Sequence, residues 1–231
     1  MGTADDLPRR ARGAVLLAGG RSSRMGQPKA LLRVGGLAMV ARVAHALERA
    51  CDELVVVTAG EPGSAAVAPE RELREVLAGT AFAARPGGLR FACDASPGRG
   101  PVAGFAAGLA ESRADTVLVA PCDLPFLSPD LVRGFFEFAE QPGKPDVVAA
   151  RRGGFWEPMP VVLRRASMAR VYAAQLEQGE LRPTASWAAM LVVAVEGEAL
   201  ARLDVDGSSF LGVNDPAELA QARARAGRGS T

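Results

Sequence analysis

Short apolar runs alternate along this chain with longer stretches in which apolar residues recur at helical spacing. The apolar runs predict seven strands, at Ala14–Ala18, Leu54–Thr58, Leu89–Cys93, Thr116–Ala120, Asp146–Ala149, Met159–Leu163 and Met190–Val195. The periodic stretches predict six helices, at Leu37–Ala50, Glu70–Ala78, Pro101–Ser112, Pro129–Glu140, Ala166–Gln178 and Pro216–Ala226. Strands that are apolar throughout indicate a sheet covered on both faces, and their alternation with helices predicts a mostly parallel, right-handed α/β layer structure.

The length of 231 residues fits one domain, which we expect to span residues 13–226 between short tails at 1–12 and 227–231. The last helix has a readable start, with Asp215 as the N-cap, Pro216 at the first helical position and Glu218 as the capping-box acid. In a parallel sheet with helices on both faces, ligands bind beyond the carboxyl ends of the strands. We therefore look for chemistry in the segments that follow the predicted strands.

Composition and charge exclude several classes of function. Lys and Arg total 27 against 26 for Asp and Glu, so the net charge of +1 gives no general basic footprint for nucleic acid or an anionic membrane. No uncharged apolar run is long enough to span a bilayer, and the charged stretch Met1–Gly13 does not read as a secretory leader. The three cysteines lie far apart and His45 is the single histidine, which argues against a zinc site or a disulfide framework and indicates a reducing cytoplasm.

The first predicted strand runs into a loop, Leu17–Lys29, that holds three glycines, two serines, two arginines and a lysine. Glycines let the backbone approach a ligand closely and point several N–H groups at it. Arg24 and Lys29 add positive charge beside those donors, so the loop suits a triphosphate whose charge grows on the leaving pyrophosphate. It is not a Walker A loop, because no Ser or Thr follows Lys29 to bind Mg²⁺. The later cluster Gly98–Gly104 is not a dinucleotide fingerprint, because an extra residue precedes its last glycine.

Two carboxylates also follow predicted strands. Asp123 comes after Thr116–Ala120, where a carboxylate is well placed to hold Mg²⁺ against phosphate oxygens, although it could also cap or order the turn before the next helix. Asp94 follows Leu89–Cys93 and could accept a hydrogen bond from a base or a ribose, or bond the backbone of its own turn.

The aromatic residues and the histidine carry weaker signals. His45 lies in mid-helix without a Ser or Cys nucleophile pattern, so covalent triad chemistry is not supported. Trp156 and Trp187 could stack on a flat ligand, but large apolar residues are more often part of the core.

Four segments together resemble the motifs of the molybdenum cofactor guanylyltransferases, a family of nucleotidyltransferases in molybdenum cofactor biosynthesis. They are Leu17–Lys29, Asp94 with Gly100–Gly104, Pro121–Phe126, and Val213–Leu219. Their order and approximate spacing cover nearly the whole chain. The resemblance implies a three-layer α/β/α, Rossmann-like nucleotidyltransferase fold, with a nucleotide-binding half at about 13–126 and an acceptor-binding half at about 127–226.

The resemblance also implies an activity, the Mg²⁺-dependent transfer of GMP from GTP to molybdopterin, which gives the guanine dinucleotide cofactor and pyrophosphate. The residues expected to contact the nucleotide are Leu17, Ala18, Gly19, Gly20, Arg24, Lys29, Thr58, Asp94, Gly100 and Asp123. Three of these, Arg24, Lys29 and Asp123, are expected to be catalytic. Asp123 would bind Mg²⁺ together with Asn214 or Asp215, and Arg182 and Asn214 would contact the acceptor. Thr58 stands where the family often has Asn, and its hydroxyl can still make one hydrogen bond to the nucleotide.

The choice of base rests on Gly19. The related cytidylyltransferases usually begin this loop with Leu-Ala-Ala-Gly, whereas here it begins Leu-Ala-Gly-Gly, and the absent Cβ at Gly19 leaves room for the larger purine. The second half departs further from the family pattern. Glu157–Pro158 stands in place of the familiar His-Pro, and Gly212–Pro216 reads Gly-Val-Asn-Asp-Pro in place of the closing Asn-x-Asn-Thr-Pro. These departures concern the acceptor rather than the donor.

Two alternatives stay open. One keeps the chemistry but uses CTP or another phosphorylated acceptor. The other is a non-catalytic nucleotide-binding protein that carries a cofactor. The presence of Arg24, Lys29 and Asp123 argues against it, because a carrier does not need all three. The family resemblance implies GTP and molybdopterin as small-molecule substrates and allows transient contact with other cofactor-biosynthesis proteins. The balanced charge indicates no nucleic-acid or membrane partner.

Overall fold

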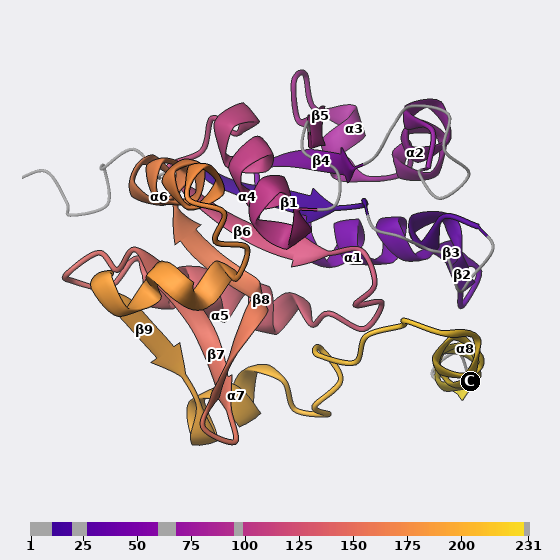
Figure 1. The fold of residues 1–231 in the computed structure, drawn as a ribbon. Helices are drawn as coiled ribbons and strands as arrows, with labels where there is room; N and C mark the ends of the chain where they lie inside the picture. The colour runs from indigo at the N-terminus through magenta and orange to yellow at the C-terminus, as the bar shows by residue number, and fades with distance from the viewer. Residues whose placement is uncertain (1–10, 20–26, 60–67, 95–98, 229–231) are drawn as a thin grey trace, which may run out of the picture.

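The computed structural model describes residues 11–19, 27–59, 68–94 and 99–228. Seven strands of this part of the chain form one sheet in the order β5-β4-β1-β6-β8-β7-β9 (Figure 1). Their bounds are β1 Arg12–Leu17, β4 Glu53–Ala59, β5 Leu89–Asp94, β6 Thr116–Pro121, β7 Val147–Arg152, β8 Phe155–Arg164 and β9 Val192–Val195. The helices are α1 Met39–Leu47, α2 Glu70–Leu77, α3 Ala81–Ala84, α4 Gly100–Glu111, α5 Pro129–Ala139, α6 Arg165–Glu177, α7 Gly197–Leu203 and α8 Pro216–Arg228. Two 3₁₀ helices, η1 Lys29–Leu31 and η2 Pro183–Ala189, and a small hairpin of β2 Arg33–Val34 and β3 Leu37–Ala38 complete the described elements.

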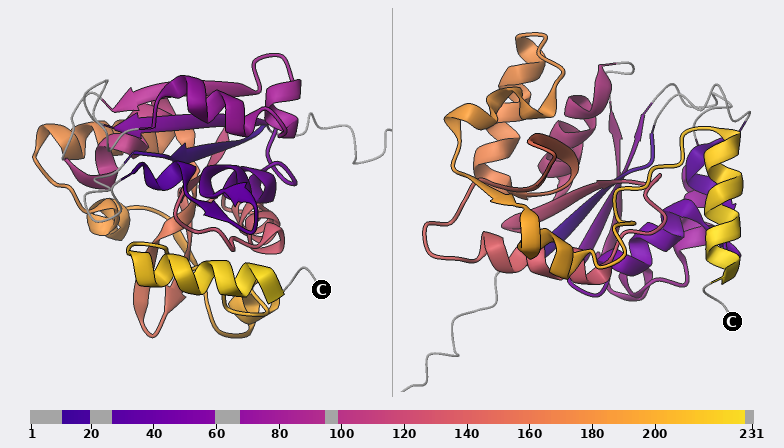
Figure 2. Two further views of the ribbon diagram at one scale, coloured as in Figure 1. Left: turned by 90° about the vertical axis from the view of Figure 1, so that its right-hand side faces the viewer. Right: turned by 90° about the horizontal axis from the view of Figure 1, so that it is seen from below.

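The sheet has helices on both faces, as the apolar strands predicted. In β1, Ala14 and Leu16 join a core that also contains residues of α1 and α5. Val15 and Leu17 point the other way, into a core shared with α4 and α6. The view from below in Figure 2 shows the sheet between these two layers. The three-layer α/β/α architecture is therefore confirmed.

Most strand pairs are parallel, but β8 runs antiparallel to both of its neighbours, β6 and β7. The reason is the connection between β7 and β8, which consists of Gly153 and Gly154 with φ angles of 55° and 86°. A two-residue turn joins only antiparallel strands, and positive φ at both positions suits the right-handed twist of a hairpin. The sequence predicted a mostly parallel sheet but not this reversal.

The predicted elements exist, but β8 begins at Phe155, four residues before the predicted Met159, and α1 ends at Leu47, three residues before the predicted Ala50. Two smaller errors in the bounds have local causes. The helix predicted from Leu37 begins only at Met39, because Leu37 and Ala38 pair with Val34 and Arg33 across a tight turn. The strand predicted from Met190 begins at Val192, because Met190 still donates its N–H to the carbonyl of Trp187 at the end of η2. The short elements η1, β2, β3, α3, η2 and α7 were not predicted.

The start of α8 follows its sequence signature. The carboxylate of Asp215 accepts a hydrogen bond from the N–H of Glu218 at 2.8 Å, and the Glu218 carboxylate accepts one from the N–H of Asn214. Leu219 and Ala222 of this helix pack into a small core with residues of the segment Leu32–Met39. These contacts place the end of the chain beside the segment that follows the glycine-rich loop. Among the helices of the described residues, none has the length and apolar character needed to cross a bilayer.

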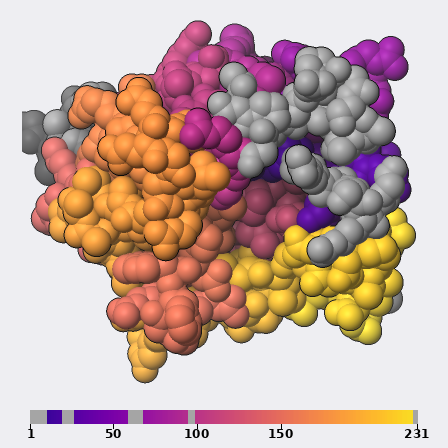
Figure 3. Space-filling model, viewed as in Figure 1, coloured from indigo at the N-terminus to yellow at the C-terminus, as the bar shows by residue number. Residues whose placement is uncertain are grey.

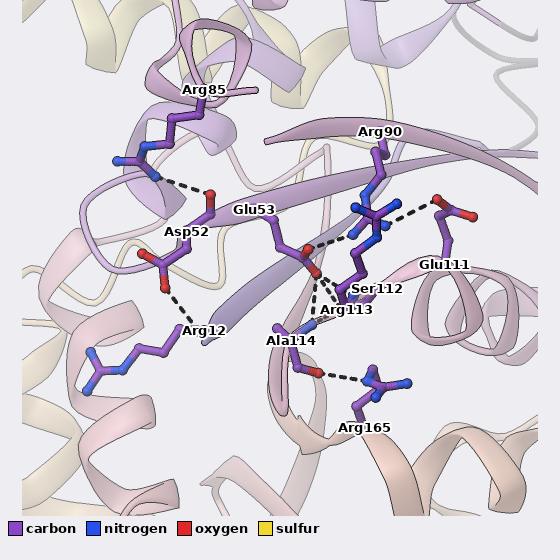
Figure 4. Close-up of polar contacts among 10 residues, drawn as sticks. All are labelled: Arg12, Asp52, Glu53, Arg85, Arg90, Glu111, Ser112, Arg113, Ala114 and Arg165. Carbon is purple, nitrogen blue, oxygen red and sulfur yellow. Dashed lines mark hydrogen bonds and ion pairs between the residues drawn. The ribbon is translucent and has the colours of Figure 1, made fainter. Parts of the chain in front are cut away.

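At the amino ends of the strands, one carboxylate organises a polar network (Figure 4). Glu53, the first residue of β4, pairs with the guanidinium of Arg90 on β5, and both side chains are 13% exposed. The same carboxylate accepts hydrogen bonds from the Ser112 hydroxyl at 2.6 Å and from the N–H groups of Arg113 and Ala114 at 2.8 and 3.1 Å. A single acidic side chain thus ties the β5 strand and the α4–β6 connection to β4.

We expect Glu53→Gln to lower the free energy of unfolding by about 2–3 kcal/mol, because it removes the shielded one of the two carboxylates that pair with Arg90. Urea denaturation of wild type and variant measures the difference. The matched control is Glu111→Gln, which removes the other carboxylate near Arg90, 42% exposed, and should cost less than about 1 kcal/mol. Equal losses in the two variants would contradict the central role of Glu53.

Candidate functional site

The carboxyl ends of β4, β1 and β6 meet at one edge of the sheet. Leu17 is in register with Val57 on β4 and with Pro121 on β6. The pairing continues past the strand ends, because Ala18 donates its N–H to the Val57 carbonyl at 2.8 Å and Cys122 donates to the Leu17 carbonyl at 3.0 Å. Of the residues predicted to contact the nucleotide, Leu17, Ala18, Gly19, Thr58 and Asp123 thus lie along this edge, whereas Gly20 and Arg24 lie outside the described residues.

Three polar side chains from distant parts of the sequence meet at this edge. The Lys29 ammonium lies 2.9 Å from Oδ1 of Asn214, to which it donates a hydrogen bond, and 3.4 Å from Oδ2 of Asp123. The side chains of Lys29 and Asp123 are 20% and 24% exposed, so the ion pair is partly shielded from water. The sequence singled out all three residues, but no sequence pattern linked Lys29 to Asn214, 185 positions away.

The backbone fixes the two oxygen-bearing residues of this group. Asp123 lies in the turn after β6, and its carbonyl accepts a hydrogen bond from the N–H of Val213 at 2.9 Å. The next residue, Asn214, is held by the Glu218 carboxylate at the start of α8. Figure 3 shows this face of the molecule hollowed between the orange surface of α6 and η2 and the yellow surface of the C-terminal segment.

Asp94 and Gly100 lie further along the same edge, at the end of β5 and the start of α4. Asp94 is 5% exposed and stands opposite Ala59 in the β4–β5 ladder. Gly100 has a φ of 67°, and a Cβ there would lie 3.6 Å from the carbonyl oxygen of Leu181. The left-handed backbone favours glycine at the position, whereas 3.6 Å is an ordinary van der Waals distance for a Cβ. The contact also places the segment before η2 beside the first turn of α4.

The other two predicted binding residues have partners of their own. Asp215 accepts a hydrogen bond from the backbone at the start of α8, so one of its carboxylate oxygens serves the helix cap. Arg182 is 79% exposed and donates to both oxygens of the Glu180 carboxylate at 3.1 and 3.0 Å. The hydrogen bonds from the Arg182 side chain and backbone lower the pKa of Glu180 to about 2, so this carboxylate is ionised at neutral pH.

The donor atoms at this edge suit a hard cation better than a soft one. Near the Lys29 ammonium lie a carboxylate oxygen and an amide oxygen, both hard donors. Within the described residues no group of three or more His, Cys, Asp or Glu side chains could hold a metal ion. Mg²⁺ often uses one or two protein oxygens and takes its other ligands from water and substrate phosphates. Cys122 adjoins Asp123, but burial raises its pKa to about 12, so it remains a neutral thiol.

Comparison with known proteins agrees with this geometry. Residues 14–191 match the model of the MobA-like NTP transferase domain. A probable molybdenum cofactor guanylyltransferase of Natronomonas pharaonis is 32% identical over 217 residues, which cover 93% of this chain and 98% of the relative. A second, from Pelotomaculum thermopropionicum, is 33% identical over 212 residues that cover 92% of each chain.

Solved structures share the fold at lower identity. The molybdopterin-guanine dinucleotide biosynthesis protein A of Archaeoglobus fulgidus superposes with a TM-score of 0.71 at 21% identity, covering 94% of this chain and 99% of its own. The 2-C-methyl-D-erythritol 4-phosphate cytidylyltransferase of Thermus thermophilus gives a TM-score of 0.61 at 22% identity, covering 92% of this chain and 98% of its own. The fold, the edge that gathers Lys29, Asp123 and Asn214, and the nearly full-length relatives agree, and the chain belongs to the MobA-like family of nucleotidyltransferases.

Proposed function

We propose that this protein transfers GMP from GTP to molybdopterin and releases pyrophosphate. The observation that carries the proposal is the meeting of Lys29, Asp123 and Asn214 at the carboxyl edge of the sheet, next to the loop that follows β1. The two relatives that match more than nine-tenths of the chain, both named as molybdenum cofactor guanylyltransferases, support the choice of donor and acceptor. Residues 13–226 act as one unit in this proposal, because strands of both halves share one sheet.

The reaction needs no protein nucleophile. A terminal phosphate oxygen of the acceptor forms a bond to the α-phosphorus of GTP, while the bond from that phosphorus to the oxygen bridging the α- and β-phosphates breaks. The electron pair of the broken bond leaves on pyrophosphate. Because the attacking phosphate is already anionic, the protein contributes positioning and neutralisation of charge.

Lys29 and Arg24 supply positive charge to the departing pyrophosphate in this scheme. Lys29 reaches that position from its place beside Asp123 and Asn214, whose oxygens are then left for a divalent cation. Mg²⁺, when bound there with water and phosphate oxygens, draws electron density from the phosphates and so favours attack at the α-phosphorus. Of the two candidates for the second metal ligand, Asn214 is favoured over Asp215, because the Asp215 carboxylate already caps α8.

The donor is bound along β1, β4 and β5. In this proposal Gly19, Gly20 and Gly100 contact the nucleotide, and Asp94 and Thr58 contact its nucleoside part. The missing Cβ at Gly19 favours guanine over cytosine. Asn214 and Arg182 contact the acceptor. The enzyme works in the cytoplasm, and its product passes to other proteins by transient contact.

The test of this function is pyrophosphate release with Mg²⁺ and molybdenum-loaded molybdopterin, with GTP and CTP measured side by side. Release with GTP and not with CTP is the expected result. Release with CTP alone would overturn the base assignment at Gly19. GTP binding with no release from either nucleotide would favour another acceptor or a cofactor carrier.

Lys29→Met and Asp123→Asn should each lower kcat by about 10²–10³-fold, because the first removes positive charge from the departing pyrophosphate and the second removes the charged oxygen that would hold Mg²⁺. Single-turnover pyrophosphate release measures the loss. The chain has one other lysine, Lys144, in an exposed turn, and Lys144→Met is the matched control that should keep full activity. A Lys29→Met enzyme with wild-type kcat would contradict the mechanism.

Lys29 also predicts how the site treats a divalent cation in the absence of nucleotide. In the wild type the ammonium lies against the two oxygens of Asp123 and Asn214, and like charge so close disfavours a second cation. Lys29→Met should therefore bind Mn²⁺ without nucleotide at least tenfold more tightly than the wild type, as measured by the loss of free Mn²⁺ signal in electron paramagnetic resonance. The double variant Lys29→Met/Asp123→Asn should lose this gain, and a gain that persists would place the metal elsewhere.

A further inference from the structure

The two tryptophans of the chain have different surroundings. Trp187, in η2, is 2% exposed and belongs to the core between the sheet, α4 and α6. Trp156, the second residue of β8, packs against the same core but is only partly buried. One tryptophan is therefore a core residue, and the other presents part of its indole to solvent. The proposed reaction assigns no role to either.

A chain of buried aromatic contacts fixes the orientation of Trp156. Its ring lies edge to face with Trp187, with 5.6 Å between ring centroids and 79° between the planes. Trp187 donates its indole N–H to the Tyr172 hydroxyl at 3.2 Å, and Tyr172 donates in turn to the Pro183 carbonyl at 3.4 Å. Tyr172 also packs edge to face on Phe105 of α4, at 5.1 Å. A ring backed in this way is pre-organised, so little conformational entropy is lost when a ligand stacks on it.

A cationic side chain stands over the Trp156 ring. Arg151 is the cross-strand partner of Trp156 in the β7–β8 ladder, so both side chains leave the same face of the hairpin. The guanidinium carbon of Arg151 is 5.7 Å from the Trp156 ring centroid, and its Nε donates to the Gly154 carbonyl at 3.2 Å. A flat ring between two planar groups needs about 7 Å, two contacts of roughly 3.5 Å each. The exposed Arg151 side chain would have to move outward by only about 1–1.5 Å to admit one.

The order and direction of the strands place this pair on the acceptor side of the reaction. Asp123 follows β6, and the donor contacts lie on one side of β6, along β1, β4 and β5. The neighbour on the other side is β8, whose antiparallel register with β6 runs from Thr116 opposite Arg164 to Val119 opposite Val161. The first residues of β8 therefore point toward the edge where β6 ends, and the last residues of β7 lie beside them.

We propose that Trp156 and Arg151 form the subsite for the acceptor's ring: a planar heteroaromatic ring stacks on the Trp156 indole, and the Arg151 guanidinium closes over it. The inference rests on the proposed function for the identity of the acceptor. The neighbouring Arg152 is not part of the subsite, because it pairs with Glu157 at 3.2 Å and stacks on Phe210 at 4.9 Å. A phosphorylated acceptor without a flat ring, such as a sugar phosphate, would not need Trp156.

The test compares three substitutions of one residue in the full-length protein. Trp156→Leu keeps an apolar side chain but removes the flat face, Trp156→Ala removes both, and Trp156→Phe keeps a smaller flat ring. Trp156→Leu and Trp156→Ala should raise the KM for molybdopterin roughly 10- to 100-fold, the size expected for one lost stacking contact, and Trp156→Phe by only about threefold. The KM for GTP and kcat at saturating acceptor should stay within about twofold of wild type.

A second readout does not depend on turnover. A phosphate-free oxidised pterin is the probe, and its binding to the GTP-loaded protein is followed by its own fluorescence anisotropy. Wild type and Trp156→Phe should bind it, Trp156→Leu should not, and Arg151→Met should bind it several-fold more weakly. The control is Phe155→Leu, which removes the neighbouring aromatic ring of β8, 80% exposed and opposite Arg152 in the hairpin, and should bind as well as wild type.

The outcomes separate this inference from the proposed function. Wild-type turnover with an acceptor KM unchanged in Trp156→Leu would overturn the subsite and leave the guanylyltransferase activity standing. Failure of the wild type to turn over molybdopterin, together with pterin binding that Trp156→Leu abolishes, would overturn the proposed acceptor and keep the ring subsite. Equal pterin affinity in wild type and Trp156→Leu would overturn the subsite, with or without turnover of molybdopterin.

Discussion

The carboxyl edge of the sheet depends on one interaction, the ion pair between the partly shielded carboxylate of Asp123 and the ammonium of Lys29. Asp123 sits in a turn at the end of a central strand, where the side chain is only 24% exposed. Lys29 pairs with this side chain and at the same time binds the amide oxygen of Asn214. The contact joins the end of the glycine-rich loop, the end of β6 and the start of α8. A nucleoside triphosphate with its metal ion can replace both partners of this ion pair. The metal ion would take the place of the ammonium beside Asp123, and the phosphates would take the place of the carboxylate beside Lys29.

The two ends of the sheet are built on different physical terms. At the amino ends, Glu53 has four hydrogen-bonding partners from the protein itself. At the carboxyl ends, the N–H groups and side chains come from loops and strand ends whose partners can be replaced. The network around Glu53 therefore stabilises the fold, whereas the charged groups at the carboxyl edge are available to a ligand.

The sequence predicted much of this because its strongest signals are local. Buried strands appear as short apolar runs, and a residue that follows such a run, such as Asp123, must lie at the carboxyl edge. The capping signature of Asp215 and Glu218 is local too, and it was confirmed. The direction of β8 was missed because it depends on a two-glycine turn, Gly153–Gly154, rather than on the strand's own composition. The approach of Asn214 to Lys29 is a tertiary contact that no spacing encodes.

The reversal at β8 has a chemical consequence. In a wholly parallel sheet, the strand beside β6 would present its last residues at the reactive edge. Because β8 runs the other way, it presents its first residues there, and the hairpin brings the end of β7 with them. Two adjacent strands thus contribute a paired set of side chains, Arg151 and Trp156, that face the same side. If the donor is bound by the loops of parallel strands and the acceptor by the hairpin, as proposed, the two meet at β6, and Asp123 lies where their reacting phosphates would come together.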